Sequence, residues 1–348
     1  MNVEYVNKVI RLCDDYVKSN DPKMKWMWGE GLLGYALLKL DEKLGTSRYT
    51  EFIKKYCDYY VLNQPLIDQA DRVAPVLITY TMQKLTGNED YKKLTERGIN
   101  YIVNSPRLVD DCVNHLGNSL VGKFYPKSIW VDSLMMFGVL PAIYGKGEGR
   151  QDILDMAASQ PLTHAKYLNN RKSGLWYHSY WTRLKQAYPQ RSLYWARGNG
   201  WVLCALPMIL DQLSDNDKNK QEIIWMYQKT SAAVRTYQKH SGMFTTLLTK
   251  KSYEETSATA LIAAGFLHGA QQGYLDASYL ESGLKSYRSV VDHLYINDLG
   301  NMAMPLISGP TIPMPIFPKL GYTLVPRKDN WSYGIAALIF ATIQYINA

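Results

Sequence analysis

Helical periodicity along the whole chain is the feature that most restricts its fold. Apolar residues recur three or four positions apart, as the buried face of an α-helix requires, throughout the 348 residues. Thr86-Gly87-Asn88 and Asp215-Asn216-Asp217 mark boundaries between such segments. The spacing predicts helices over residues 3–19, 30–45, 48–62, 70–86, 89–104, 129–144, 149–169, 197–213, 216–239, 254–271, 275–294 and 330–346.

Twelve helices in a chain of this length correspond to six helical hairpins of about 58 residues each. Hairpins of this kind close into a ring of inner and outer helices, with the long connections gathered at one end, where a cleft forms. The predicted connections 20–29, 105–128 and 170–196 are long, whereas 46–47 and 87–88 are short. We therefore predict an all-α fold, an (α/α)6 barrel. A helical solenoid, in which the hairpins stack without closing, is the alternative.

The segments between the predicted helices show no convincing series of strands. No linker rich in Gly, Ser or Pro divides the chain, because the Pro-rich residues 312–318 lie near its C-terminal end. We therefore expect a single domain over residues 1–348. Short β-hairpins could form in 105–128, 172–190, 242–252 and 296–325.

The charge and the apolar content exclude some classes of partner. The formal net charge of +8 is spread along the chain, without a run long enough for a nucleic-acid arm. It indicates a solvated basic surface, or attraction of anionic substrates toward a cleft. No stretch reaches the roughly 18 apolar residues of a membrane span, and no secretory signal is visible. We expect no nucleic-acid and no membrane partner, and a cytoplasmic location, or a periplasmic one if a leader has been removed.

Cysteine and aromatic content give two further indications. The four cysteines form no CxxC pair and indicate buried, reduced thiols. The chain contains 27 Tyr and nine Trp, and several of the Trp lie in polar, Gly-containing segments between predicted helices. Aromatic residues often serve core packing, but flat rings in a cleft also stack on the apolar faces of sugars. A carbohydrate site is consistent with this pattern.

The sharpest local signal is the sequence Trp-Ala-Arg-Gly-Asn-Gly-Trp at residues 195–201, where a helix is predicted to begin. Glycine lets a backbone approach a ligand closely, and Arg197 can fork onto a carboxylate. The amides of a helix N-terminus add positive potential. The structural alternative is a corner in which Arg197 caps a buried carbonyl. We favour the ligand-binding interpretation.

Two aspartates lie near predicted helix starts. Asp132 sits beside apolar residues, and in an apolar pocket desolvation would raise its pKa and keep it protonated, as a general acid needs. Asp71 would push that pKa further upward if the two carboxyls lay close together. Successive inner helices of such a barrel start at the same end, so the two can meet. Taken alone, each aspartate is more often a helix cap.

Other polar and aromatic segments offer weaker signals. His178 could bind a ligand or serve the structure, and Glu255 is typical of a helix cap. The sequence has no HExxH motif, phosphate-binding glycine loop or nucleophile elbow, and its six His show no metal-ligand spacing. We expect no metal and no other cofactor.

In their order along the chain these motifs resemble the glycoside hydrolase families of unsaturated rhamnogalacturonyl hydrolases and unsaturated glucuronyl hydrolases, the six-hairpin glycosidases. The resemblance covers nearly the whole chain, and its most specific part is Arg-Gly-Asn-Gly-Trp. The motifs that carry it are Trp-x-x-Gly-x-Gly at 26–31, Asp-x-x-x-Pro at 71–75, Tyr-Pro-x-x-x-Trp-x-Asp at 125–132, Gly-Leu-Trp-Tyr-His at 174–178, residues 195–201, Glu-Thr-Ser-Ala-Thr-Ala at 255–260 and Trp-Ser-Tyr-Gly at 331–334.

The resemblance implies an (α/α)6 catalytic domain that releases a terminal unsaturated uronic acid from short oligosaccharides, such as those left when a lyase cuts pectin. In these families the C4=C5 enol ether is hydrated, and the glycosidic bond is not displaced directly. Asp132 matches the general acid/base, which protonates C4 and activates water for C5, and Asp71 matches the second carboxylate. The positions that match or adjoin substrate contacts are Arg197, Trp195, Trp201, His178, Trp28, Trp130 and Asn199.

Some residues depart from the family pattern. A histidine expected about nine residues before the Trp-x-Asp motif is missing; Val121 stands near that place, and His115 is the only nearby candidate. Trp28 replaces the tyrosine of the first motif, and the loop 243–251 is unusually basic. These departures concern the sugar next to the uronate. The alternatives are another (α/α)6 enzyme, such as a polysaccharide lyase or a sugar epimerase, and a non-catalytic sugar-binding relative. We expect a monomer or a homodimer.

Overall fold

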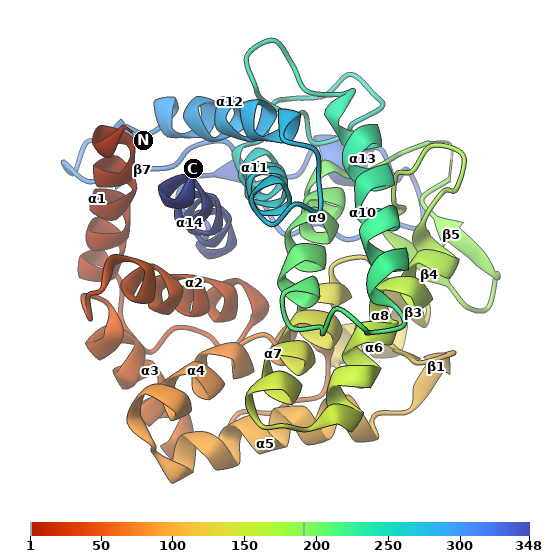
Figure 1. The fold of residues 1–348 in the computed structure, drawn as a ribbon, viewed down its shortest axis with the longest axis horizontal. Helices are drawn as coiled ribbons and strands as arrows, with labels where there is room; N and C mark the ends of the chain where they lie inside the picture. Colours follow the sequence, from red (N-terminus) through yellow and green to blue (C-terminus); the bar gives the residue numbers. More distant parts are fainter. Residues whose placement is uncertain (1, 191) are drawn as a thin grey trace.

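Helices arranged as a ring dominate a computed structural model of the chain, which describes residues 2–190 and 192–348 (Figure 1). Twelve helices of eight residues or more lie in this part of the chain. They are α1 (Val3–Ser19), α2 (Trp28–Leu44), α3 (Thr50–Leu62), α4 (Val76–Thr86), α5 (Glu89–Asn104), α7 (Leu140–Gly147), α8 (Gln151–Leu168), α9 (Ala196–Leu210), α10 (Lys220–Arg235), α11 (Thr256–Gln271), α12 (Ser278–Asp292) and α14 (Ser332–Asn347).

The ring closes on itself. Helices α2, α4, α7, α9, α11 and α14 form the inner circle, in which neighbours pack together and α14 returns to α2. The contact between α7 and α9 runs through a π-helical turn, Met135–Val139, that precedes α7. Helices α1, α3, α5, α8, α10 and α12 lie outside this circle. The predicted (α/α)6 barrel is therefore confirmed, and the open solenoid is excluded.

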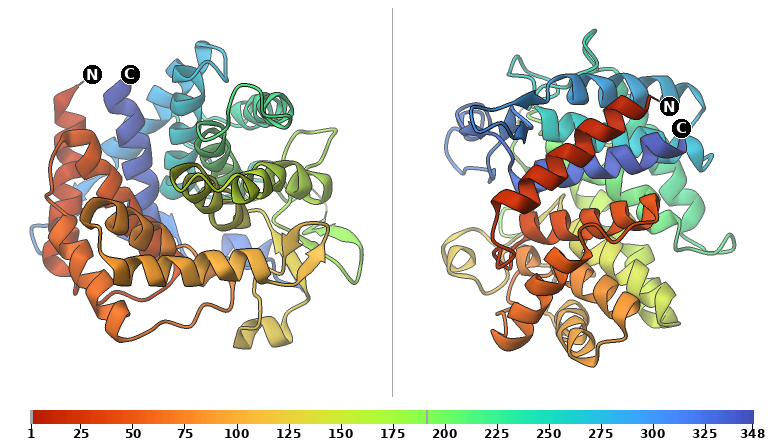
Figure 2. Two further views of the ribbon diagram at one scale, coloured as in Figure 1. Left: turned by 60° about the horizontal axis from the view of Figure 1, so that its bottom comes forward. Right: turned by 90° about the vertical axis from the view of Figure 1, so that its left-hand side faces the viewer.

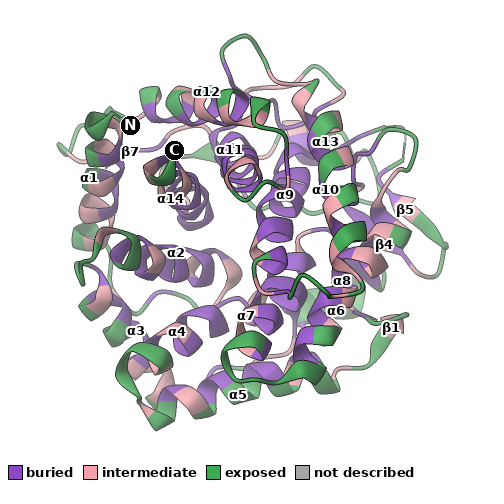
Figure 3. Cartoon of the chain, in the orientation of Figure 1, coloured by how far each residue is buried: buried purple, intermediate pink, exposed green. Residues whose placement is uncertain are grey.

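Burial explains why each helix occupies its layer. Every residue of α11 from Thr256 to Gly269 is buried, as an inner helix that is packed on all sides requires. Outer helix α1 buries only one stripe, which includes Val9 and Leu12. Figure 3 shows the same contrast around the ring. Small residues set the inner spacing: a Cβ on Gly265 would lie 2.6 Å from the carbonyl oxygen of Leu203 on α9.

Short strands and turns occupy the connections. The largest sheet has the order β3-β4-β5, with Ile129 opposite Tyr180 and Tyr180 opposite Ala187. The other paired strands are β1 with β2, β6 with β7, and β8 with β9. The remaining bounds are β1 (Arg107–Val109), β2 (Cys112–Val113), α6 (Leu120–Phe124), β3 (Ser128–Trp130), β4 (Ser179–Trp181), β5 (Gln186–Tyr188), β6 (Tyr295–Ile296), β7 (Met302–Ala303), β8 (Ile307–Ser308), α13 (Leu320–Thr323) and β9 (Arg327–Lys328).

Two predicted helices begin much later than expected. The segment 129–144 was predicted to be helical throughout, but Ser128–Trp130 is strand β3, because its backbone pairs with β4. A short apolar run has no periodicity that separates strand from helix. The segment predicted as 70–86 divides into a 3₁₀ turn, Ala70–Arg72, and α4, since Pro75 takes the N-cap position. Both changes leave an aspartate in a turn just before an inner helix.

The first and last helices lie side by side (Figure 2). The backbone N–H of Asn2 donates to the hydroxyl of Tyr345 over 2.8 Å, which ties α1 to α14 where the ring closes. All four cysteines are buried and free, as predicted. No helix within the described ranges combines the length and apolar character needed to cross a membrane.

Candidate active site

The predicted functional residues gather where the inner helices begin. Asp71 lies in the 3₁₀ turn before α4, and Asp132 lies in the turn between β3 and the π-helical turn before α7. Trp28 and Arg197 stand in the first turns of α2 and α9, and Glu255 caps α11. Helix N-termini carry partial positive charge from their free amides. This end of the barrel therefore favours anionic groups.

Asp132, Asp71 and His115 form the acidic centre of this end. His115 is 1% exposed, and its Nε2 lies 3.5 Å from Oδ1 of Asp71. Its Nδ1 lies 2.8 Å from the Ser133 hydroxyl. Oδ1 of Asp132 is buried and has no hydrogen-bond partner among the described residues. The two aspartates that the sequence could only suggest as neighbours thus interact electrostatically with the same histidine.

Burial raises the pKa of Asp132, because removing a carboxylate from water disfavours its charged form. The charge of His115 opposes this rise, and the charge of Asp71 adds to it. Burial alone would lower the pKa of His115, but the neighbouring Asp132 and Asp71 outweigh it and raise that pKa. Asp132 therefore holds a proton at higher pH than an ordinary aspartate, which suits a general acid.

Sequence reasoning underrated His115. Its ring stacks on Trp130 with centroids 4.3 Å apart. Its backbone joins the two acidic segments, because its carbonyl accepts from Ala70 N–H and its N–H donates to the Ser128 carbonyl, at 2.9 and 3.0 Å. It lies seventeen residues before Asp132 in a non-helical segment, so no periodicity relates the two. The available signal was that no other histidine lies between Asp71 and Asp132.

An aromatic wall adjoins the acidic centre. Trp130 meets His178 edge-on at 5.1 Å, and His178 stacks on Trp195 at 4.2 Å. Nδ1 of His178 lies 2.9 Å from the Tyr322 hydroxyl, whereas its Nε2 is buried without a partner among the described residues, as is the indole Nε1 of Trp195. Burial holds the pKa of His178 well below its usual value, and the charges of His115 and Arg197 lower it further. His178 is therefore neutral.

Arg197 is 1% exposed and is held on several sides. Its Nη1 and Nη2 atoms donate to the carbonyls of Ser308 and Gly309 over 2.7 and 2.9 Å. Nη1 also lies 3.6 Å from Oε1 of Glu255, and the guanidinium sits 4.8 Å from the ring centroids of Trp195 and Tyr333. In this structure Arg197 caps buried carbonyls, which was the structural alternative, and only its Nε has no partner among the described residues.

Of the other predicted substrate contacts, one is half-buried and two are buried behind the site. Trp28 is half-buried, stacks on Tyr333 at 4.4 Å and meets Trp201 edge-on at 6.3 Å. Trp201 itself is 1% exposed, so it supports Trp28 from behind. Asn199 is fully buried, and its amide exchanges hydrogen bonds with the backbone N–H and C=O of Trp176 over 2.9 and 3.0 Å. The structure thus gives Asn199 and Trp201 supporting positions.

The helix cap predicted at Glu255 is confirmed, because its Oε2 accepts from the backbone N–H of Ala258.

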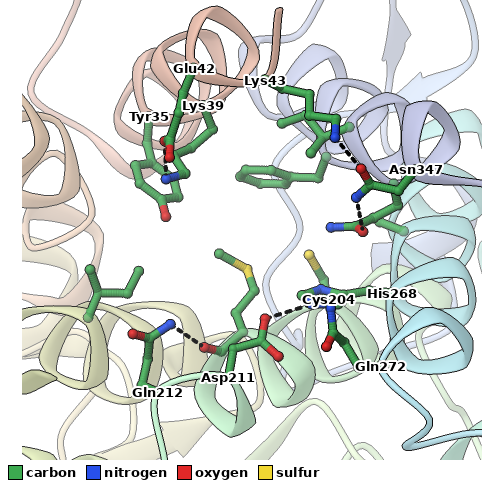
Figure 4. A pocket seen from close by; sticks show the side chains of 16 residues that line it. Tyr35, Lys39, Glu42, Lys43, Cys204, Asp211, Gln212, His268, Gln272 and Asn347 are labelled. Atoms are coloured by element: carbon green, nitrogen blue, oxygen red, sulfur yellow. Dashed lines mark hydrogen bonds and ion pairs between the residues drawn. The ribbon is translucent and has the colours of Figure 1, made fainter. Parts of the chain in front are cut away.

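A concave region lies at the opposite end, where the inner helices finish (Figure 4). It has a volume of about 640 Å³ and is lined from α2, α7, α9, α11 and α14. Most of its charged groups pair with one another: Asp211 with His268 at 2.7 Å, and Lys39 with Glu42, while Lys43 donates to the side chain of Asn347. In the acidic centre, by contrast, Oδ1 of Asp132 is buried without a hydrogen-bond partner among the described residues. The aspartates and the aromatic wall therefore mark the candidate active site.

An (α/α)6 barrel with two acidic residues and an aromatic wall at the N-terminal ends of its inner helices is consistent with a carbohydrate-active enzyme. The chain belongs to Glycosyl Hydrolase Family 88, whose family model matches residues 3–348. It is therefore a glycoside hydrolase.

Similar proteins agree with this membership. The chain is 25% identical over 343 residues to the unsaturated rhamnogalacturonyl hydrolase YesR of Bacillus subtilis, covering 97% of this chain and 95% of that one. Among solved structures, a possible member of the GH105 family from Klebsiella pneumoniae is similar with a TM-score of 0.88 at 23% identity, over 100% of this chain and 94% of that one. The unsaturated glucuronyl hydrolase of Bacillus sp. GL1 gives a TM-score of 0.77 at 15% identity, over 99% and 97%. The structural likenesses bear on the fold alone.

Proposed function

We propose that this chain is an unsaturated rhamnogalacturonyl hydrolase, which releases a terminal 4,5-unsaturated uronic acid from short oligosaccharides. Family membership and the full-length similarity to YesR support this substrate class. The observation that carries the proposal is the environment of Asp132. Its Oδ1 is buried without a partner among the described residues, and its pKa is raised.

In the proposed reaction Asp132 donates its proton to C4 of the unsaturated ring. The positive charge that develops at C5 and the ring oxygen is stabilised by nearby carboxylate charge, for which Asp71 is positioned. The ionised Asp132 then takes a proton from water as the water oxygen bonds to C5. The resulting hemiketal opens and expels the remaining sugar. One water molecule is consumed, and Asp132 ends protonated as it began.

The aromatic wall and its neighbours are proposed to hold the sugar. Trp28 is half-buried and offers a flat apolar ring, which suits the C–H face of a pyranose, whereas Trp130 and Trp195 are each 3% exposed and make up the buried part of the wall. His178 is neutral and buried, with an unpaired Nε2, so it can hydrogen-bond a substrate oxygen. Arg197 contributes positive charge and its Nε, while its two terminal nitrogens hold protein carbonyls.

An absorbance assay tests the proposal. The conjugated C=C–carboxylate group of an unsaturated uronide absorbs in the ultraviolet, and hydration abolishes that band. Purified protein is incubated with the unsaturated rhamnogalacturonan disaccharide and, separately, with unsaturated glycosaminoglycan disaccharides. We expect the band of the first to decay. The Asp132→Asn variant should bind this substrate with turnover reduced by at least about a hundredfold, the low end of a general acid's contribution.

Asp110→Asn is the matched control, because Asp110 is exposed and its φ of 44° suits asparagine. It should keep wild-type activity. Decay of only the glycosaminoglycan band would overturn the rhamnogalacturonyl assignment while keeping the reaction class. Binding without decay of either band would indicate a non-catalytic relative, and a band that grows from saturated polymer would indicate a lyase. Full activity of Asp132→Asn would remove Asp132 from its role.

A further inference from the structure

A long loop brings one tyrosine from far along the sequence into the aromatic wall. Residues 309–326 leave the barrel between β8 and β9, whose pairing of Ser308 with Arg327 closes the base of the loop. The hydroxyl of Tyr125 donates to the Pro313 carbonyl over 2.6 Å, and that of Tyr188 donates to the Met314 carbonyl over 2.8 Å. The loop is therefore fastened at its base and along its length.

Tyr322 lies on the returning part of this loop and is fully buried. Its side chain packs in one apolar cluster with Leu193, Trp195 and Leu247. Its hydroxyl lies 2.9 Å from Nδ1 of His178, 144 positions away in the sequence. Burial raises its pKa well above the ordinary value, so the phenol keeps its proton. Tyr322 can therefore act as a hydrogen-bond donor at neutral pH.

The strengths of donors and acceptors decide which nitrogen of His178 carries the proton. A neutral imidazole has one N–H donor and one acceptor nitrogen. If Nδ1 carried the proton and donated to Tyr322, the buried phenol O–H would have no acceptor that the structure shows. If Tyr322 donates to Nδ1, the phenol is satisfied and Nε2 carries the proton, and that N–H is then the buried donor without a partner among the described residues. Each arrangement leaves one donor unpaired, at a similar cost of about 1–3 kcal/mol. The second is favoured because a phenol O–H is a stronger donor than an imidazole N–H, and an imidazole nitrogen is a stronger acceptor than a phenol oxygen.

We infer that Tyr322 is a positioning residue, which fixes the imidazole of His178 in the tautomer protonated at Nε2 and so presents an N–H to a substrate oxygen. The step toward substrate rests on the proposed function. The tautomer does not, because it follows from the contacts of His178 and Tyr322 alone. The same contact makes docking of the 309–326 loop a condition for a correctly oriented His178.

Nitrogen NMR of the histidine rings tests the inference without any substrate. In protein labelled with ¹⁵N-histidine, the His178 ring is assigned by its disappearance in His178→Asn. We expect Nε2 protonated and Nδ1 unprotonated, unchanged from about pH 6 to 8. In Tyr322→Phe the Nδ1 signal should move toward that of an acceptor without a hydrogen bond, with both tautomers populated. A wild-type ring protonated at Nδ1, or at both nitrogens, would overturn the inference.

Kinetics give a second readout, with Tyr188→Phe as the matched control. That variant also removes a tyrosine hydroxyl bound to the loop, but this hydroxyl has no contact with His178. We expect Tyr322→Phe to lower kcat/KM on the unsaturated disaccharide by about tenfold, the value of one hydrogen bond. Tyr188→Phe should keep the His178 tautomer. Unchanged kcat/KM in Tyr322→Phe would refute the role toward substrate. If no unsaturated uronide is cleaved by the wild type, the NMR result still decides the tautomer.

Discussion

Replacing Arg197 with lysine distinguishes between two uses of the same buried side chain. The sequence suggested a fork for a substrate carboxylate, whereas the structure shows Nη1 and Nη2 donating to the carbonyls of Ser308 and Gly309 at the base of the 309–326 loop. Lysine keeps the charge but carries it on a single nitrogen, so it cannot reproduce both bonds or lie flat between two rings. The substitution therefore removes the paired hydrogen bonds and the flat stacking of the guanidinium, and it keeps the positive charge.

The size of the effect follows from the contacts. Losing one charge-assisted hydrogen bond to a buried carbonyl costs about 1.5–3 kcal/mol. The guanidinium also sits 4.8 Å from the ring centroids of Trp195 and Tyr333, and a desolvated cation–π contact contributes about 2 kcal/mol, part of which lysine retains. We expect the loop to lose about 2–4 kcal/mol of local stability. Even the lower figure increases the population of the opened loop about thirtyfold.

Limited proteolysis measures this opening. Lys319 lies on the exposed part of the loop, so trypsin cleavage there reports the fraction of molecules in which the loop has detached. The cleavage rate should rise about thirtyfold in Arg197→Lys. Arg327→Lys is the control, because Arg327 is an exposed arginine of β9 at the same loop base and should change the rate little. Cleavage at the wild-type rate together with a raised KM would refute our reasoning and restore the fork toward substrate.

Two further substitutions test the acidic centre. His115→Gln removes a charge that lowers the pKa of Asp132, so in a kcat/KM profile the limb on which activity falls as pH rises should move to higher pH. His164→Gln is the control and should leave this limb in place, since burial lowers the pKa of His164 to about 4. A limb that moves to lower pH in His115→Gln would contradict the assignment. Gly31→Ala would place a Cβ 2.5 Å from the backbone nitrogen of Pro75. The clash should lower the free energy of unfolding, measured by urea denaturation, by about 1–3 kcal/mol. It should also reduce activity, because it shifts the turn that holds Asp71. Gly34→Ala, which meets the flexible end of Ile78, should cost less; equal losses would argue against the backbone clash.

The sequence was sufficient for the helical architecture because the signal is local. Helices 3–19 and 89–104 were predicted with the bounds that the structure shows, and most of the other long helices differ by a few residues. The start predicted at 70 is wrong because Pro75 takes the N-cap position, and the start predicted at 129 is wrong because Ser128–Trp130 pairs with a strand elsewhere in the chain. An apolar triplet such as Ile129–Val131 is compatible with either a strand or a helix, and only the strand that pairs with it decides between them.

The site was predictable where one motif supplies both the residue and its place. Asp132 and Asp71 could be named because each precedes an inner helix. Tyr322 could not be named, and His115 was only a candidate for a missing histidine, because each reaches the site from a loop, through contacts that join distant segments. The bonds of Arg197 were equally hidden, since its acceptors lie 111 and 112 positions further along the chain. Loop contacts of this kind leave no periodic trace in a sequence.

The far end of the ring offers room for engineering. Gly45, Gly87 and Gly273 follow the ends of α2, α4 and α11 in left-handed conformations, and no atom would lie within 4 Å of a Cβ added at any of them. These turns sit a full helix length from the residues that we assign to chemistry. These turns could accept an inserted peptide tag, a surface-anchoring segment or a fused domain. The protein could then be attached to a solid support at this end, while the end that carries the candidate active site stays open to dissolved oligosaccharides.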